Sequence, residues 1–169
     1  KAGKSLQLYR HSLFEATKVV LIGAGSANAR QVRQAVLSAV GIVRAGAAKK
    51  VLISHVLLDG AATASIGALV RATVAAAADA SYVYASTKSK VDSRKLTTVT
   101  LSVPDVSAVQ ADFLHAKALV AGVELAKEWG NRPANHATPT MLGEVARTIS
   151  KRSSISCDVL GPKQVAALR

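Results

Sequence analysis

Short apolar runs and alternating positions mark four segments of the chain as strands. The compact apolar runs at 18–23 and 50–54 are typical of buried strands. Residues 6–9 and 96–103 alternate instead, and the pattern in 96–103 predicts a strand with one covered face.

Apolar residues spaced by three and four positions predict three helices in the first 130 residues. The first follows Asn28, a residue type suited to capping a helix, and carries apolar positions from Val32 to Val43. The second spans 62–78. The third starts near Val106, has about six or seven turns and ends at Gly130, as helices often end at glycine.

The segment after the third helix predicts the start of another folded unit. Thr138 suits the cap position and Pro139 the first helical position, so a helix is expected from Pro139 to about Lys151. A strand at 155–160 and a further helix at 162–168 are expected to follow.

These elements predict an α/β fold. We expect a layered α-β-α domain with a mixed, partly parallel sheet at 1–104, incomplete at its start. A linking helix at 105–130 and the truncated beginning of a second α/β domain at 131–169 follow.

Composition narrows the class of protein. Half of the residues are apolar and 4% are aromatic, which favours a core of small aliphatic side chains. The longest runs without Lys, Arg, Asp or Glu, such as 60–70, fall short of the ~20 residues of a membrane span. A single cysteine, Cys157, cannot form an intrachain disulfide and suits the cytoplasm.

Positive charge is concentrated in the first domain. Residues 1–104 hold 14 basic and 4 acidic residues, a net charge of +10 out of +12 for the whole chain. One stripe of the first helix can present Arg30, Arg33 and Arg44. The loop predicted at 82–95 carries four further basic residues beside two tyrosines: Lys88, Lys90, Arg94 and Lys95. Clustered positive charge of this kind is the electrostatic signature of nucleic-acid binding, and these four residues are the candidate contacts.

Other candidate motifs are weaker. The turn Gly23-Ala-Gly-Ser26 lies between a strand and a helix, where phosphates can bind, but the third glycine of a dinucleotide fingerprint is replaced by Asn28. No histidine pair or cysteine pair has zinc-ligand spacing, and the ten acidic residues are scattered. We therefore expect no catalytic residue and no metal ligand in these 169 positions.

One stretch of the chain resembles a known family. Gly122 to Glu128, followed by the pattern Asn131-x-Pro133-x-Asn135-x-x-Thr138-Pro139, is similar to the sequence that opens the catalytic domain of leucyl aminopeptidases. Residues 79–84 and 87–90 resemble the stretch before the edge strand of that family, and 156–160 with 164–168 resemble the strand and helix before its first catalytic block.

The resemblance implies a cytoplasmic enzyme that removes N-terminal amino acids from peptides. In the family, two divalent ions (zinc, manganese or magnesium) activate a water molecule, and the assembly is usually a hexamer. The metal ligands lie beyond the position that matches Arg169, so the resemblance assigns none to this sequence. Some bacterial members also bind DNA through surfaces that include the N-terminal domain.

Three hypotheses follow for the chain itself. It is a catalytically silent fragment of a metal-dependent aminopeptidase, a nucleic-acid-binding module that uses its basic first domain, or a structural element that helps to assemble the hexamer. An activity assay, a salt-dependent binding assay and light scattering separate these hypotheses.

Overall fold

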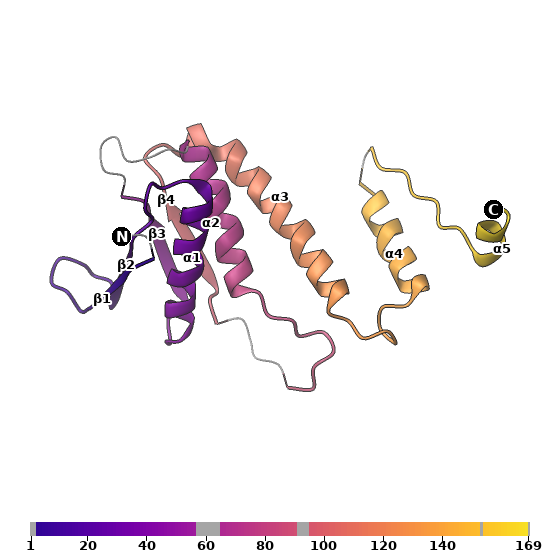
Figure 1. Ribbon diagram of the computed structural model, residues 1–169, viewed down its shortest axis with the longest axis horizontal. Coiled ribbons are helices and arrows are strands. Elements are labelled where there is room, and N and C mark those ends of the chain that lie inside the picture. The colour runs from indigo at the N-terminus through magenta and orange to yellow at the C-terminus, as the bar shows by residue number, and fades with distance from the viewer. Residues whose placement is uncertain (1–2, 57–64, 91–94, 153, 169) are drawn as a thin grey trace. The chain divides into compact units, whose positions relative to one another are not determined.

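A computed structural model describes residues 3–56, 65–90, 95–152 and 154–168 (Figure 1). The chain forms two compact units, Lys1–Ala126 and Lys127–Arg169, and each is described by itself. The domain limits expected from the sequence, at 104 and 130, remain a prediction.

The first unit opens with an antiparallel hairpin. Strands β1 (Ser5–Tyr9) and β2 (Lys18–Ile22) pair so that Leu6 lies opposite Leu21 and Leu8 opposite Val19. Both strands were predicted, but β2 is not fully buried, because Leu21 is 50% exposed. Only two strands form this sheet in the described part of the chain, and no residue of β2 is fully buried.

Helices α1 (Ala29–Arg44) and α2 (Ile66–Ser81) pack side by side and form the core of this unit (Figure 1). The Asn28 side chain accepts a hydrogen bond from the Gln31 amide, so the predicted cap is confirmed. The second helix begins at Ile66, four residues later than expected; positions 62–64 lie outside the described residues. Burial against the partner helix involves mainly valine, leucine and alanine: Val32, Val36, Val40, Leu69, Ala76 and Ala77.

A parallel pair of strands packs against these helices. In β3 (Lys50–Ser54) and β4 (Thr98–Ser102), Val51 lies opposite Val99 and Ile53 opposite Leu101. Val51 and Ile53 contact the helical core, whereas Leu52 between them is 67% exposed. The predicted parallel pairing is confirmed. The prediction that 50–54 is buried throughout is wrong, because only one face of the pair is covered.

Helix α3 (Val106–Gly130) has the bounds that its apolar spacing predicted. Just before it, the Asp105 carboxylate accepts hydrogen bonds from the hydroxyl and amide of Ser107, at 2.7 and 2.8 Å. These hydrogen bonds, with the Ala108 amide, hold the pKa of Asp105 below its usual value. Among the described residues, no helix combines the length and the apolar character needed to span a bilayer.

The second unit contains α4 (Pro139–Ser150) and the short α5 (Pro162–Ala166). The Thr138 hydroxyl accepts a hydrogen bond from the Met141 amide, which confirms the second predicted cap. The prediction of a strand at 155–160 is wrong, since these residues are neither helical nor paired with a strand. A strand needs a neighbour to take its backbone hydrogen bonds, and the described part of this unit offers none.

Candidate functional site

The basic loop after α2 is an extended surface segment over its described residues. Its two tyrosines are half-buried, and the Tyr84 hydroxyl lies 2.9 Å from the hydroxyl of Thr87. The Lys88 amide donates to the Ala85 carbonyl at 3.1 Å, which closes a turn. Lys88 ends this turn, Lys90 follows two residues later, and both are exposed. Two of the four candidate residues therefore face solvent at or just after a hydrogen-bonded turn.

The remaining two candidates precede β4 in the sequence. Arg94 is outside the described residues, and Lys95 is exposed. The Lys49 carbonyl accepts hydrogen bonds from the amides of Thr97 and Thr98, at 2.8 and 3.2 Å. Lys50 lies opposite Thr98 in the parallel register. The amino end of β3 therefore lies beside the amino end of β4.

This pairing adds Lys49 and Lys50, both exposed, to the neighbourhood of Lys95. Sequence analysis missed the two lysines because they are 45 positions or more away along the chain. The sequence did contain a signal for these two lysines. In a parallel pair of strands, the residues that precede the two strands lie side by side at the same end of the sheet. We call Lys49, Lys50, Lys88, Lys90 and Lys95 the basic edge.

The arginine stripe predicted on α1 is not a free basic surface. Arg33 forms an ion pair with Asp79 at 2.5 Å, and the Arg44 guanidinium donates a hydrogen bond to the Ala80 carbonyl. Both partners belong to the last turn of α2. A cation near the carboxyl end of a helix is favourable because the terminal carbonyls carry partial negative charge. Two of the three arginines therefore connect α1 to α2, although Arg33 is still exposed, as Arg30 is, whereas Arg44 is half-buried.

The glycine-containing turn between β2 and α1 is closed by the chain itself. The Gln31 carboxamide oxygen accepts hydrogen bonds from the Ser26 amide and hydroxyl, at 2.9 and 2.8 Å. Gly25 has φ +60°, and an added Cβ there would lie 2.9 Å from the same oxygen. A phosphate oxygen would need the donors that Gln31 already occupies. These hydrogen bonds show that the turn is a structural link between β2 and α1.

One histidine of the first unit is half-buried against α2. His55 follows β3, and its Nε2 lies 2.8 Å from the hydroxyl of Thr73, a residue of α2 that is 1% exposed. Burial lowers the pKa of His55 from its usual 6.5, since desolvation disfavours the charged imidazolium. Within the ranges that the structure describes, no three His, Cys, Asp or Glu side chains gather as metal ligands would.

The proline- and asparagine-rich stretch forms a tight corner in the second unit. The Lys127 carbonyl accepts from both the Asn131 amide and the Asn131 side chain, at 3.0 and 2.7 Å. The Arg132 guanidinium stacks on the Trp129 ring at 4.0 Å and forms an ion pair with Glu128 at 3.3 Å. The stretch therefore acts as a hydrogen-bonded helix stop, with the capped α4 directly after it.

Two relatives of the chain are longer proteins, and both are described as probable cytosol aminopeptidases. The probable cytosol aminopeptidase of Acidovorax ebreus is 46% identical over 168 residues, which cover 99% of this chain and 33% of the relative. The protein of the same description from Verminephrobacter eiseniae is 44% identical over 99% of this chain and 31% of its own length. The chain thus spans about a third of the length of these relatives.

Solved structures with the same fold come from more distant proteins. The bottromycin maturation enzyme BotP has a TM-score of 0.80 and 22% identity, over 99% of this chain and 35% of BotP. BotP has also been solved in complex with Mn, with a TM-score of 0.78. A tomato leucine aminopeptidase mutant has a TM-score of 0.82 and 24% identity, over 99% of this chain and 34% of that protein.

The family follows from a match that covers more than half of the chain. Residues 1–91 match the N-terminal domain of the cytosol aminopeptidase family. This region includes the hairpin, the two core helices, β3 and the loop with Lys88 and Lys90. The chain therefore belongs to the cytosol aminopeptidase family, and its first 91 residues match the N-terminal domain of that family.

Proposed function

We propose that this chain is the N-terminal part of a metal-dependent leucyl aminopeptidase, which releases N-terminal amino acids from peptides. The observation that carries the proposal is the 46% identity along nearly the whole chain to a probable cytosol aminopeptidase three times as long. An identity of this level over 168 residues extends past the N-terminal domain, through α3 and the corner at 127–138.

In this proposal the chain supplies a scaffold and the rest of the polypeptide supplies the chemistry. Residues 131–169 begin the peptidase domain, a second α/β domain. Two divalent ions (Mn, Zn or Mg) are bound by ligands beyond Arg169, and the polypeptide works as a cytoplasmic hexamer. The Mn complex of BotP supports the metal part, because BotP has the same fold over 99% of this chain. The chain itself contributes no catalytic residue.

The test is hydrolysis of a leucyl-anilide with added Mn²⁺ by the 169-residue chain and by the longer polypeptide that contains it. We expect turnover by the longer polypeptide and none by the chain. Turnover by the purified chain would contradict the assignment of all metal ligands to the rest of the polypeptide. A longer polypeptide without aminopeptidase activity would contradict the proposed reaction.

A second candidate function is nucleic-acid binding, and the basic edge favours it. Parallel pairing brings Lys49 and Lys50 close to Lys95, and the loop after α2 exposes Lys88 and Lys90. Ammonium groups of this kind contact phosphates and release counterions, which makes affinity fall steeply with salt. The stripe of α1 supports it less, since Arg33 and Arg44 are engaged within the fold. Binding to duplex DNA at low salt tests this candidate, and no binding at low salt ends it.

A further inference from the structure

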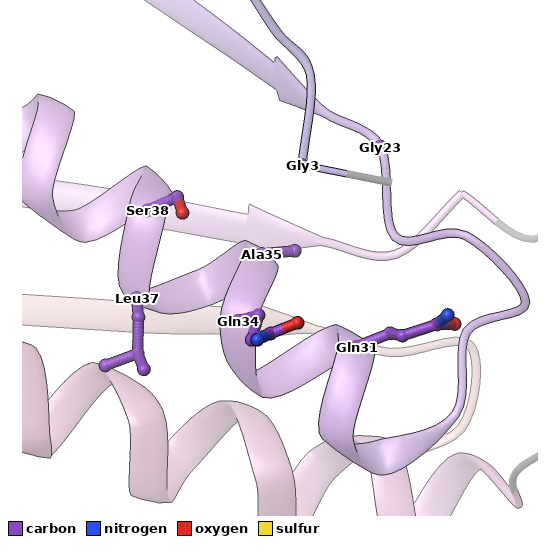
Figure 2. A pocket seen from close by; sticks show the side chains of 7 residues that line it. All are labelled: Gly3, Gly23, Gln31, Gln34, Ala35, Leu37 and Ser38. Carbon is purple, nitrogen blue, oxygen red and sulfur yellow. The ribbon is translucent and has the colours of Figure 1, made fainter. Parts of the chain in front are cut away.

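The tip of the β1–β2 hairpin is apolar and exposed. Residues 10–17 connect the two strands, and this segment projects away from the helices (Figure 1). Within it, Leu13 is 79% exposed and Phe14 is 49% exposed. At the other end of the hairpin, Gly3 and Gly23 lie across a cavity of about 420 Å³ from α1 (Figure 2). The hairpin therefore lies beside the helical core at one end and holds two large apolar side chains in solvent at the other.

Hydrogen bonds hold the tip in one shape. The Arg10 amide donates to the Thr17 carbonyl at 3.0 Å, and the Phe14 amide donates to the His11 carbonyl at the same distance. The His11 ring accepts a hydrogen bond from the Leu13 amide and lies 5.9 Å from the Phe14 ring. Arg10 has φ +46°, in the left-handed region that few residues other than glycine adopt. Backbone strain of this kind concentrates at binding sites, so an ordered turn presents the apolar side chains.

A tyrosine and two cations lie directly behind the apolar tip. Lys18 pairs with Tyr9 across the hairpin, and its ammonium group is 5.2 Å from the centre of the tyrosine ring. Tyr9 is 65% exposed, and the neighbouring Arg10 is exposed as well. Residues 1–18 hold four basic residues and one acidic residue, Glu15. An apolar end followed by tyrosine, lysine and arginine matches the depth profile of a bilayer surface, where these three residue types lie among the headgroups.

We propose that the hairpin tip docks on a membrane surface that carries anionic headgroups. Leu13 and Phe14 enter the boundary between headgroups and acyl chains, while Arg10 and Lys18 contact lipid phosphates. The charge of the chain, +12, complements such a surface, which attracts lysine and arginine. A projecting tip can enter a deformable bilayer directly, whereas a protein partner needs a pocket of matching shape. The contact involves the surface only and requires no spanning helix.

Sedimentation with lipid vesicles tests the proposal. We expect the chain to bind vesicles with equal amounts of phosphatidylglycerol and phosphatidylcholine, and to bind pure phosphatidylcholine more weakly. Leu13→Ser with Phe14→Ser keeps the charge and should weaken binding to the mixed vesicles at least about tenfold. Leu114→Ser with Leu119→Ser is the matched control on α3, where these leucines are 54% and 53% exposed, and should leave binding unchanged. Equal effects of the two double variants would overturn the proposal.

Charge variants give a second readout, with opposite signs. Glu15→Gln should strengthen binding to the mixed vesicles by up to about fivefold, and Lys18→Gln should weaken it by a similar factor. Lys117→Gln on α3 removes the same charge as Lys18→Gln and should have the smaller effect. If the two lysine variants weaken binding equally, the chain adsorbs through its net charge and the proposal is wrong.

Tryptophan fluorescence reports whether the tip enters the bilayer. Phe14→Trp in a Trp129→Phe background places the single tryptophan of the chain at the tip. With mixed vesicles, its emission should shift to shorter wavelength and should be quenched by brominated acyl chains. Vesicle binding without either change would show that the tip stays in water and would overturn the proposal. Self-association without vesicles that Leu13→Ser with Phe14→Ser abolishes, seen by light scattering, would assign the tip to a second copy and would also overturn it.

Discussion

The Asp112 carboxylate of α3 lies directly over Gly67, at the amino end of α2. An added Cβ at Gly67 would lie 2.6 Å from the Asp112 Cγ, so a larger residue there requires the carboxylate to shift. Asp112 also forms an ion pair with Arg71, one turn further along α2. The first turn of α2 contains no acidic residue of its own. Asp112 therefore supplies from α3 the negative charge that the amino end of a helix favours.

This contact predicts that Gly67→Ala destabilises the first unit. The methyl group forces Asp112 away from α2 and disturbs its ion pair with Arg71, at a cost of about 1–3 kcal/mol in the free energy of unfolding. Urea denaturation measures the change. Gly122→Ala in α3 is the matched control: no atom lies within 4 Å of the added Cβ, so this variant should gain up to about 1 kcal/mol. Equal effects of the two variants would show that Asp112 moves aside freely.

The two arginines of α1 that reach α2 should differ in their contributions to stability. Arg44→Ala leaves the half-buried Ala80 carbonyl without its donor, which should cost about 1–2 kcal/mol. Arg33→Ala breaks an ion pair whose side chains are 48% and 33% exposed, and solvent limits the cost to about 0–1 kcal/mol. Arg30→Ala, with an exposed side chain, serves as the control. Thermal unfolding of the three variants should rank Arg44→Ala as the least stable.

His55 predicts a pH dependence of stability in mildly acidic solution. Its pKa in the folded chain lies below the usual 6.5, so the unfolded chain binds the proton first as the pH falls. The free energy of unfolding should be unaffected by His55 above about pH 7. It should decrease as the pH falls through 6.5 and level off below the folded-state pKa. The pKa of Asp105 is also lowered, from its usual 3.8, so Asp105 titrates at a lower pH than the region around 6.5 where His55 acts.

Denaturation of the wild type and of His55→Gln between pH 4 and 8 measures this effect, with NMR titration of the His55 ring as a direct check. The substitution should flatten the pH dependence around 6.5. A His55 pKa at or above 6.5 in the folded chain would contradict the burial of the imidazole against Thr73.

The basic edge predicts that two segments far apart in the sequence act together on DNA. Lys49→Ala with Lys50→Ala should reduce the slope of log affinity against log salt by up to about 0.9 for each phosphate that the variant no longer neutralises. Lys88→Ala with Lys90→Ala should have a similar effect. Lys117→Ala, on α3 with its ammonium over the Phe113 ring, should leave the slope unchanged and is the control. If the Lys117→Ala control reduces the slope as much as either double variant, binding reflects net charge and not this edge.

Local signals in the sequence were sufficient to predict where the helices of the chain form. The apolar spacing of α3 and the glycine at 130 predicted both of its ends, and the caps Asn28 and Thr138 form as expected. These features depend on contacts within about one helical turn. They are therefore visible in the order of residues alone.

The errors involve partners that are distant in the sequence. The strand expected at 155–160 has suitable residues but no neighbour in the described part of its unit. The α1 stripe looked free because Asp79 and Ala80, which engage Arg33 and Arg44, come more than 30 positions later. The contribution of Lys49 to the basic edge depends on the register of β3 with β4. Sequence periodicity describes a face of an element and does not identify what covers it.

A titration of Mn²⁺ into the 169-residue chain and into the longer polypeptide tests the central claim most directly. The claim is that these residues build the scaffold of an aminopeptidase while the metal centre is built by the rest of the polypeptide. We predict two tightly bound ions per longer polypeptide and none per chain. Two ions held by the chain alone would contradict the claim.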